Sequence, residues 1–286
     1  MGGSQSTAVP PDITQLTYNI GNQTEFHIKS SDVHESPAWW KLVCNTIKGK
    51  GKNLKILHVQ FSERFTRKMP AEHKRKILDG IKMLFKIPNK KRRDFSYHFS
   101  GHLKIFSHPD LKEVWEDKNF AFAKSLFFKD ELFVTGFKNL CVSLSKSESL
   151  KELKLKIKNT GFFLNMLSAA INNNTSLDEL SLTLDSSSLM AENETKDQLA
   201  VESNNQINSI VSFHSADSAS EFYNLSDHED DVSEVMYENK LLSYNATVTK
   251  LSLSGFIYSH TALYIFGGLS LNYTVADLYL FYVKFE

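Results

Sequence analysis

Residues that could act as nucleophiles, general bases or metal ligands are present, but their spacing matches no catalytic pattern. The ten histidines are scattered, and the chain contains no H-E-x-x-H, C-x-x-C, G-x-S-x-G or phosphate-loop motif. Cys141 stands among apolar residues of an expected helix, which favours a small buried thiol over a reactive one. We therefore expect no enzymatic activity, no cofactor and no metal. A hydrolase or transferase stays open only if the fold assembles a polar cluster that spacing does not reveal.

The acidic tract SDHEDD (226–231) is the strongest local concentration of charge. It could chelate a divalent cation, or Ser226 could be phosphorylated, because acidic side chains follow at the third position. The spacing does not match an EF-hand loop. We favour a solvated acidic tract, with Ser226 as a candidate phosphorylation site, over a metal site.

The first six residues, MGGSQS, fit the N-myristoylation pattern M-G-x-x-x-[ST], with Gly2 as the acylated residue. One myristoyl chain binds a membrane only marginally and needs a second signal. The KKRR run could supply that signal, because each basic residue near an anionic leaflet contributes about 1 kcal/mol; it consists of Lys90, Lys91, Arg92 and Arg93. The alternatives are a flexible terminus and a solvated polar face.

Composition and charge narrow the class of protein. Of the 286 residues, 41% are hydrophobic and 23% charged, which is ordinary for a globular chain, and a net charge of zero gives no reason to expect a nucleic-acid partner. The charge is distributed unevenly along the chain. Residues 41–93 contain 17 Lys and Arg but only 3 Asp and Glu, whereas residues 185–240 contain 13 Asp and Glu but only 2 Lys. Two cysteines, no secretory signal and no long apolar run predict a cytoplasmic protein.

A period of 27 residues organises the apolar positions. Two sets of four residues each have counterparts 27 positions later. The first set is Leu150, Leu153, Leu155 and Ile157, with counterparts Leu177, Leu180, Leu182 and Leu184. The second set is Asn245, Val248, Leu251 and Leu253, with counterparts Asn272, Val275, Leu278 and Leu280. A period of 20–29 residues with L-x-x-L-x-L predicts stacked units of one strand and one helix, neither of which can bury its apolar face alone.

These patterns divide the chain into five parts. We expect a flexible segment at 1–35, a basic α/β region that includes degenerate repeats at 36–122, leucine-rich repeats at 123–185, a disordered acidic insertion at 186–232, and further repeats, truncated, at 233–286. The clearest expected helices are 36–48, 71–87, 109–125, about 162–172 and 232–245, and the clearest strands are 53–61, 94–100 and 152–157.

The repeats at 123–184 and 245–286 resemble the long units of leucine-rich-repeat proteins of the ribonuclease-inhibitor type. The resemblance implies an α/β solenoid with parallel strands on the concave face and helices on the convex face. One departure concerns the asparagine or cysteine that this family places three residues after the last leucine of L-x-L. Those positions hold Lys158, Asp185, Phe256 and Val283, so the asparagine ladder is absent or shifted, for example to Asn159.

A concave strand face is the usual binding surface of a solenoid. We expect eight side chains to point there, with a basic first half and an aromatic end: Lys154, Lys156, Ser181, Thr183, Ser252, Ser254, Tyr279 and Phe281. The sequence thus predicts a non-catalytic scaffold that binds a protein. A myristoylated membrane adaptor is one alternative, and the resemblance also allows a cytoskeletal or small-GTPase regulator. In the last repeat, Phe281, Tyr282 and Phe285 should be exposed unless something covers them.

Overall fold

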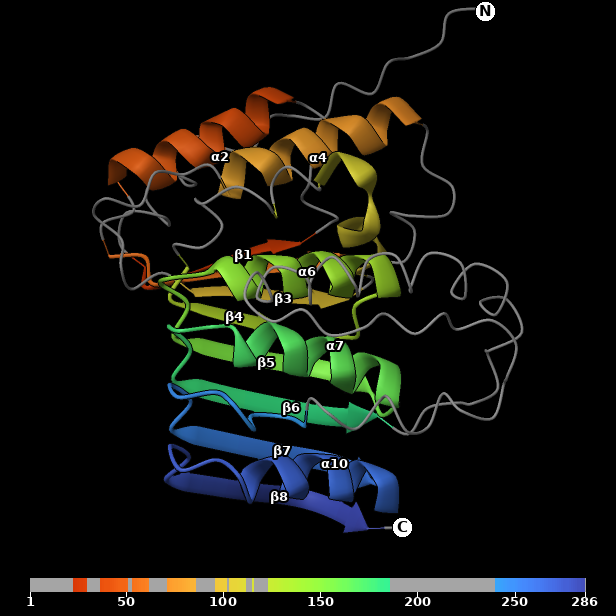
Figure 1. Cartoon of the computed structure of the whole chain (residues 1–286). Coiled ribbons are helices and arrows are strands. Elements are labelled where there is room, and N and C mark those ends of the chain that lie inside the picture. The colour runs from red at the N-terminus through yellow and green to blue at the C-terminus, as the bar shows by residue number, and fades with distance from the viewer. Residues whose placement is uncertain are drawn as a thin grey trace, which may run out of the picture.

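One sheet of eight parallel strands forms the centre of the molecule, with strands adjacent in the sheet in the order β1 to β8 (Figure 1). The computed structural model describes residues 23–29, 37–50, 53–61, 71–85, 96–101, 103–111, 115, 123–185 and 240–285. The strands are β1 Glu25–Lys29, β2 Ile56–Phe61, β3 Ser96–Gly101, β4 Ser125–Phe128, β5 Glu152–Lys158, β6 Glu179–Asp185, β7 Lys250–Ile257 and β8 Asp277–Phe285. The chain is therefore an α/β protein with a solenoid-like progression of strands.

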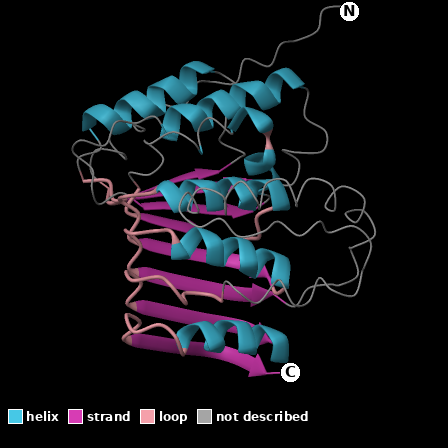
Figure 2. Ribbon diagram, viewed as in Figure 1, coloured by secondary structure: helices cyan, strands magenta, loops and turns pink. Residues whose placement is uncertain are grey.

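Helices pack on one side of this sheet (Figure 2). They are α2 Pro37–Lys50, α4 Ala71–Phe85, α6 Val134–Lys146, α7 Gly161–Asn172 and α10 Ser259–Leu269, with 3-10 turns η1 Leu103–Ser107 and η2 Pro109–Leu111. From β2 to β7, most alternate strand residues point toward the helices and are buried with the apolar side chains of those helices in a single core. None of the described helices covers the opposite face, which we call the open face.

The 27-residue period sets the register of β4 with β5, of β5 with β6 and of β7 with β8. Leu153 pairs with Leu180, and Leu251 pairs with both Leu180 and Leu278, so the four leucines lie side by side on parallel strands as expected. The units that contain β5, β6 and β7 therefore add their leucines to the same continuous interior. Complete burial of one such side chain contributes about 1.5–3 kcal/mol.

The sheet begins earlier in the chain than the sequence suggested. The expected flexible segment 1–35 contains β1, because Phe26 and Ile28 alternate toward the core and the whole strand pairs in parallel with β2. Strands β2, β3 and β4 continue the same sheet through the region 36–122 and just beyond it. Of the helix expected at 109–125, the described residues show only the 3-10 turn η2 and the helical Trp115, and Ser125 already begins β4.

Buried asparagines join successive units at the turns that precede the strands. The Asn245 amide nitrogen donates to the carbonyl oxygens of Ile171 (2.7 Å) and Asn174 (3.1 Å), and its oxygen accepts from the backbone N–H groups of Thr247 (3.0 Å) and Val248 (2.7 Å). Asn174 and Asn272 make the same four kinds of bond. An asparagine ladder therefore exists, at the opposite end of the strands from the place where the resemblance put it.

The turn after β5 holds the shifted asparagine. β5 continues through Lys158, so its turn begins one residue later, at the buried Asn159. This side chain donates to the Phe256 carbonyl (2.9 Å) and accepts from the Thr261 hydroxyl (2.7 Å). Asn159 thereby connects β5 to β7 and α10.

Between β6 and β7, the described residues 240–249 include a turn that packs beside the helices. The expected acidic insertion at 186–232, and the first part of the helix expected at 232–245, lie outside the described residues. Residues 241–244 form a turn rather than a helix, with Leu242 buried at φ 65°. This turn contacts α7 through the bond from the Ser168 hydroxyl to the Lys240 carbonyl (3.0 Å). It also meets α10, where Gly268 lies directly against Leu241.

Candidate binding face of the sheet

The strand register arranges the side chains of the open face in rows across the sheet. The middle row crosses all eight strands and consists of His27, His58, His98, Phe127, Lys154, Ser181, Ser252 and Tyr279. A second row consists of Lys156, Thr183, Ser254 and Phe281. All eight residues predicted for the concave face thus lie in two adjacent rows. Their common placement follows from the two-residue alternation of a strand.

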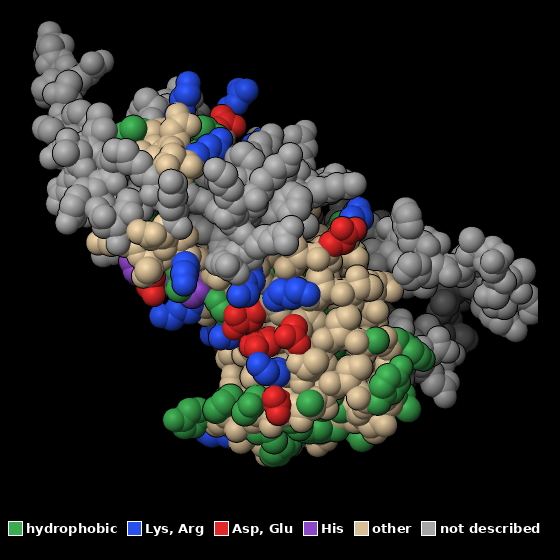
Figure 3. Space-filling model, turned by 90° about the vertical axis from the view of Figure 1, so that its left-hand side faces the viewer, with side chains coloured by type: hydrophobic (Ala, Val, Ile, Leu, Met, Phe, Trp, Pro, Cys, Tyr) green, Lys and Arg blue, Asp and Glu red, His purple; other side chains and the backbone are tan. Residues whose placement is uncertain are grey.

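Acidic neighbours neutralise the lysines of this face. The Lys154 ammonium lies 2.9 Å from the Glu152 carboxylate and 4.5 Å from the centre of the Phe127 ring. Lys156 lies 2.6 Å from Asp185, and the hydrogen bond between them raises the pKa of the ammonium. The expectation of a basic first half is therefore wrong, because the strand spacing and register bring carboxylates to both lysines. Lys and Arg are interleaved with Asp and Glu over the middle of the molecule (Figure 3).

The other half of the face changes from hydroxyl groups to aromatic rings. Thr183 and Ser254 share a hydrogen bond of 2.9 Å between their hydroxyl oxygens. On β8 the rings of Tyr279 and Phe281 stack with centres 6.1 Å apart, and both are exposed. Hydrophobic side chains gather at the end of the molecule that contains β8 and α10 (Figure 3). The aromatic end that the sequence predicted is present.

On β1 to β4, the middle row consists of a column of aromatic and histidine rings that the sequence analysis did not predict. His27 stacks on His58 with ring centres 4.1 Å apart, and edge contacts continue from His58 to His98 (4.6 Å) and from His98 to Phe127 (4.2 Å). Burial, followed by the charge of His58, lowers the pKa of His98 to about 4. The sequence pattern that could have predicted this column is alternation along the strand. Each histidine stands between two inward-facing apolar residues, as in Leu57-His58-Val59, so its own side chain must point to the open face.

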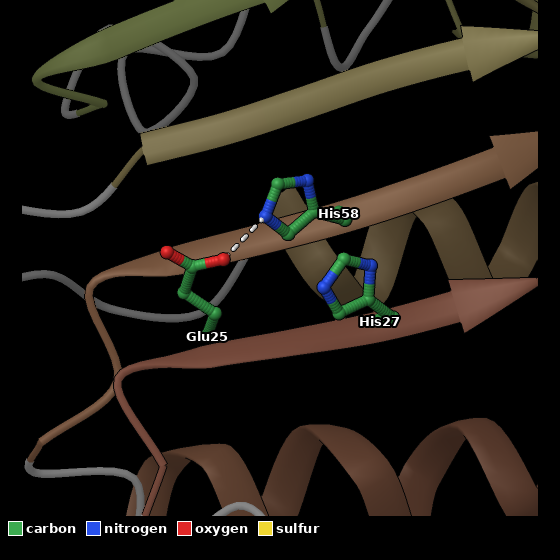
Figure 4. A group of neighbouring side chains, drawn as sticks. All are labelled: Glu25, His27 and His58. Carbon is green, nitrogen blue, oxygen red and sulfur yellow. Dashed lines mark hydrogen bonds and ion pairs between the residues drawn. The ribbon is translucent and has the colours of Figure 1, made fainter.

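The column also brings together potential metal ligands. Glu25 is two residues before His27 on β1, and its carboxylate lies 3.1 Å from the Nε2 atom of His58 on β2 (Figure 4). One ligand atom from each of the three residues lies within 4.8 Å of the other two. The sequence alone suggested no metal ligands here, because two of the residues are far from the third along the chain.

The two thiols are unsuited to nucleophilic chemistry. Burial raises the pKa of Cys44 to about 12, and it also raises the pKa of Cys141, which is fully enclosed on α6. Both groups are therefore protonated at neutral pH. The sequence prediction that Cys141 is a small buried thiol is confirmed.

The remaining predicted sites, namely Gly2, Lys90, Lys91, Arg92, Arg93 and Ser226, lie outside the described residues. Within the described residues, no helix combines the length and the apolar character needed to cross a membrane.

No protein-family model matches the chain, and no curated protein matches it.

Proposed function

We propose that this chain is a leucine-rich-repeat protein of the long-repeat class and that its open face binds a protein partner without catalysis. Three features support the repeat class: parallel strands in chain order, leucines that pair at intervals of 27 residues, and an asparagine ladder that joins the units. Such units bury their leucines only by stacking, which explains why the pattern repeats.

The observation that carries the binding proposal is the pair of rows that crosses β5 to β8. Their side chains stand on one hydrogen-bonded sheet, so a partner that binds there orders little backbone and loses less conformational entropy. Tyr279 and Phe281 offer large exposed rings of the kind that anchor protein interfaces. The neighbouring serines and the paired lysines supply hydrogen-bonding groups around those rings.

The same surface supports a partner of mixed polarity over a strongly charged one. Lys154, Lys156 and Lys250 each form an ion pair on this side of the molecule, the last with Glu179 at 2.7 Å. Paired charges contribute orientation and specificity more than attraction over a distance. A cytoskeletal protein or a small-GTPase regulator is the narrower alternative within this proposal, and the identity of the captured partner decides between them.

Affinity capture from a cell lysate with matched variants tests this proposal. Ser252→Arg combined with Tyr279→Ala fills the centre of the face and removes a ring, while Thr135→Lys changes an exposed residue on α6. We expect a protein that the wild type and Thr135→Lys both retain and that the double variant loses at least about tenfold. The proposal would be contradicted by a partner protein that the double variant still retains and that Thr135→Lys no longer retains. Circular dichroism establishes that each variant is folded.

A further inference from the structure

Three side chains with metal-binding chemistry converge where the sheet begins. Glu25 and His27 are two residues apart on β1, so both point to the open face. His58 pairs in register with His27 on β2, which places the two imidazoles on adjacent strands. Each ring turns one nitrogen toward the side on which the Glu25 carboxylate lies (Figure 4). The convergence is fixed by the backbone pairing of β1 with β2.

The three ligand atoms lie near enough to share one ion after a small movement of the side chains. The carboxylate oxygen of Glu25 lies 3.1 Å from Nε2 of His58, and the three ligand atoms lie within 4.8 Å of one another. Bonds of about 2.0–2.1 Å in a tetrahedral site place ligand atoms roughly 3.3 Å apart. The two imidazole planes are parallel within 1°, so one ring must tilt to direct its lone pair at a shared ion. Glu25 and His27 are exposed, which leaves their side chains room for this small adjustment.

We propose that Glu25, His27 and His58 bind one divalent transition-metal ion, with zinc as the best match. Two imidazole nitrogens and one carboxylate oxygen form a donor set that zinc accepts readily, and harder ions such as magnesium and calcium prefer oxygen ligands alone. Three protein ligands leave a fourth position that faces solvent. The ion joins β1 to β2 and so clamps the first two strands of the array.

The surroundings agree with such a site. The Nε2 atom of His98 is buried and has no hydrogen-bond partner among the described residues. Its ring touches His58 edge-on and closes the side of the site that faces the middle of the sheet. The opposite side, at Glu25 and His27, is exposed and gives an ion access from solvent. This site is independent of the protein-binding rows on β5 to β8.

Zinc binding by the tag-free 286-residue chain tests the proposal. The chain is freed of metal with a chelator, and zinc affinity is then measured by competition with a chromophoric indicator. Cobalt, as a substitute, reports imidazole coordination through its visible absorption. We expect one ion per chain and a loss of affinity of at least about tenfold in both His27→Ala and Glu25→Gln. Both residues are exposed, so these variants should fold.

Two controls separate this site from other histidines. His260→Ala removes an exposed imidazole on α10, and His228→Ala removes the histidine of the acidic tract. Both should leave zinc affinity unchanged, and zinc should raise the melting temperature of these two controls and of the wild type but not of His27→Ala. The proposal is overturned if the wild type binds no zinc, if His27→Ala and Glu25→Gln bind as tightly as the wild type, or if only His228→Ala loses binding.

Discussion

Single buried amides hold neighbouring units together. Asn174 and Asn245 are 2% and 4% exposed, and each satisfies two carbonyl oxygens and two backbone N–H groups that would otherwise be buried without partners. A buried polar group that loses its partner costs about 1–3 kcal/mol. The stability of the array therefore depends on a few polar side chains as well as on its leucines.

Replacement of Asn245 should show this dependence. We expect Asn245→Ala to lower the free energy of unfolding by about 2–4 kcal/mol, because four hydrogen bonds inside the protein are lost at once. Urea denaturation followed by circular dichroism measures the change. Asn173→Ala, at the half-buried residue next to Asn174, should change it by less than about 0.5 kcal/mol. Equal losses in the two variants would show that the ladder carries no special weight.

The histidine column should make stability depend on pH. Burial, followed by the charge of His58, lowers the pKa of His98 from 6.5 to about 4 in the folded chain, and Glu25, Lys154 and Glu152 act on it more weakly. Between these pH values the unfolded chain binds a proton that the folded chain does not, so stability falls as pH is lowered from about 6.5 toward 4.

His98→Phe removes this titrating group and keeps a ring beside Phe127. In buffer that contains a chelator, the urea midpoint of the wild type should drop more between pH 7 and pH 5 than that of the variant. Nuclear magnetic resonance of the His98 ring should show no titration above about pH 5. A ring that titrates near pH 6.5, or identical midpoint changes, would refute the expected neutrality of His98.

At the scale of elements, Lys240 and the turn at residues 241–244 contact both α7 and α10. The close fit of this turn against α10 depends on a missing side chain. A Cβ atom on Gly268 would lie 1.9 Å from the Leu241 carbonyl oxygen, which is far inside contact distance. The atoms nearest to a Cβ atom on Gly267 would be those at the end of the Lys240 side chain, at 3.2 Å.

These two glycines form a matched pair for mutation. Alanine normally stabilises a helix interior by about 1 kcal/mol relative to glycine. We therefore expect Gly267→Ala to leave stability unchanged or raise it, because the end of the Lys240 side chain can move. Gly268→Ala should lower the free energy of unfolding by about 1–3 kcal/mol, because the backbone must shift. Thermal and urea unfolding measure both, and a stabilising Gly268→Ala would show that α10 does not pack tightly on the turn.

The elements that sequence predicted best are those with leucines at a fixed interval. The sequence predicted that parallel strands would place three leucines side by side, because a repeated unit can bury its apolar face only against another such unit. The structure pairs Leu153 with Leu180 and Leu180 with Leu251. The turn at Leu242 escaped prediction because its apolar pattern suits a helix, whereas tertiary contacts hold that residue at φ 65°.

The candidate sites were predicted unevenly for a similar reason. Alternation along each strand was enough to place Ser181 and Tyr279 on the open face. The ion pair of Lys156 with Asp185 depends on the register between two strands, which could not be predicted from the amino-acid composition. The approach of Glu25 to His58 depends on the pairing of β1 with β2. Strand β1 was not predicted, because it lies in a polar N-terminal sequence.

At the scale of the whole molecule, one end of the core is open. Leu251 and Leu253 on β7 are fully buried, whereas their counterparts Leu278 and Leu280 on β8 are 43% and 46% exposed. Phe281, Tyr282 and Phe285 are exposed as well, as the sequence predicted. A hollow of about 930 Å³, lined mainly by apolar residues such as Phe266 and Phe285, lies at this end. Exposed apolar surface of this kind favours association.

We expect the chain to self-associate through this end at high concentration. Leu280→Lys should weaken the association, because a charge at an edge strand disfavours contact with a second copy. Sedimentation velocity over a concentration series measures the effect. Thr135→Lys adds the same charge on α6 and should leave the association unchanged. Equal behaviour of the two variants would place the contact elsewhere.

The junction between β6 and β7 has a consequence for the continuity of the chain. Backbone pairing across these strands, the bond from the Tyr264 hydroxyl to the Leu164 carbonyl and the two bonds of Asn159 all bridge residues on either side of positions 186–239. These contacts join the two sides of the junction noncovalently. We therefore expect two separately synthesised polypeptides, 1–185 and 240–286, to associate through these contacts when they are mixed.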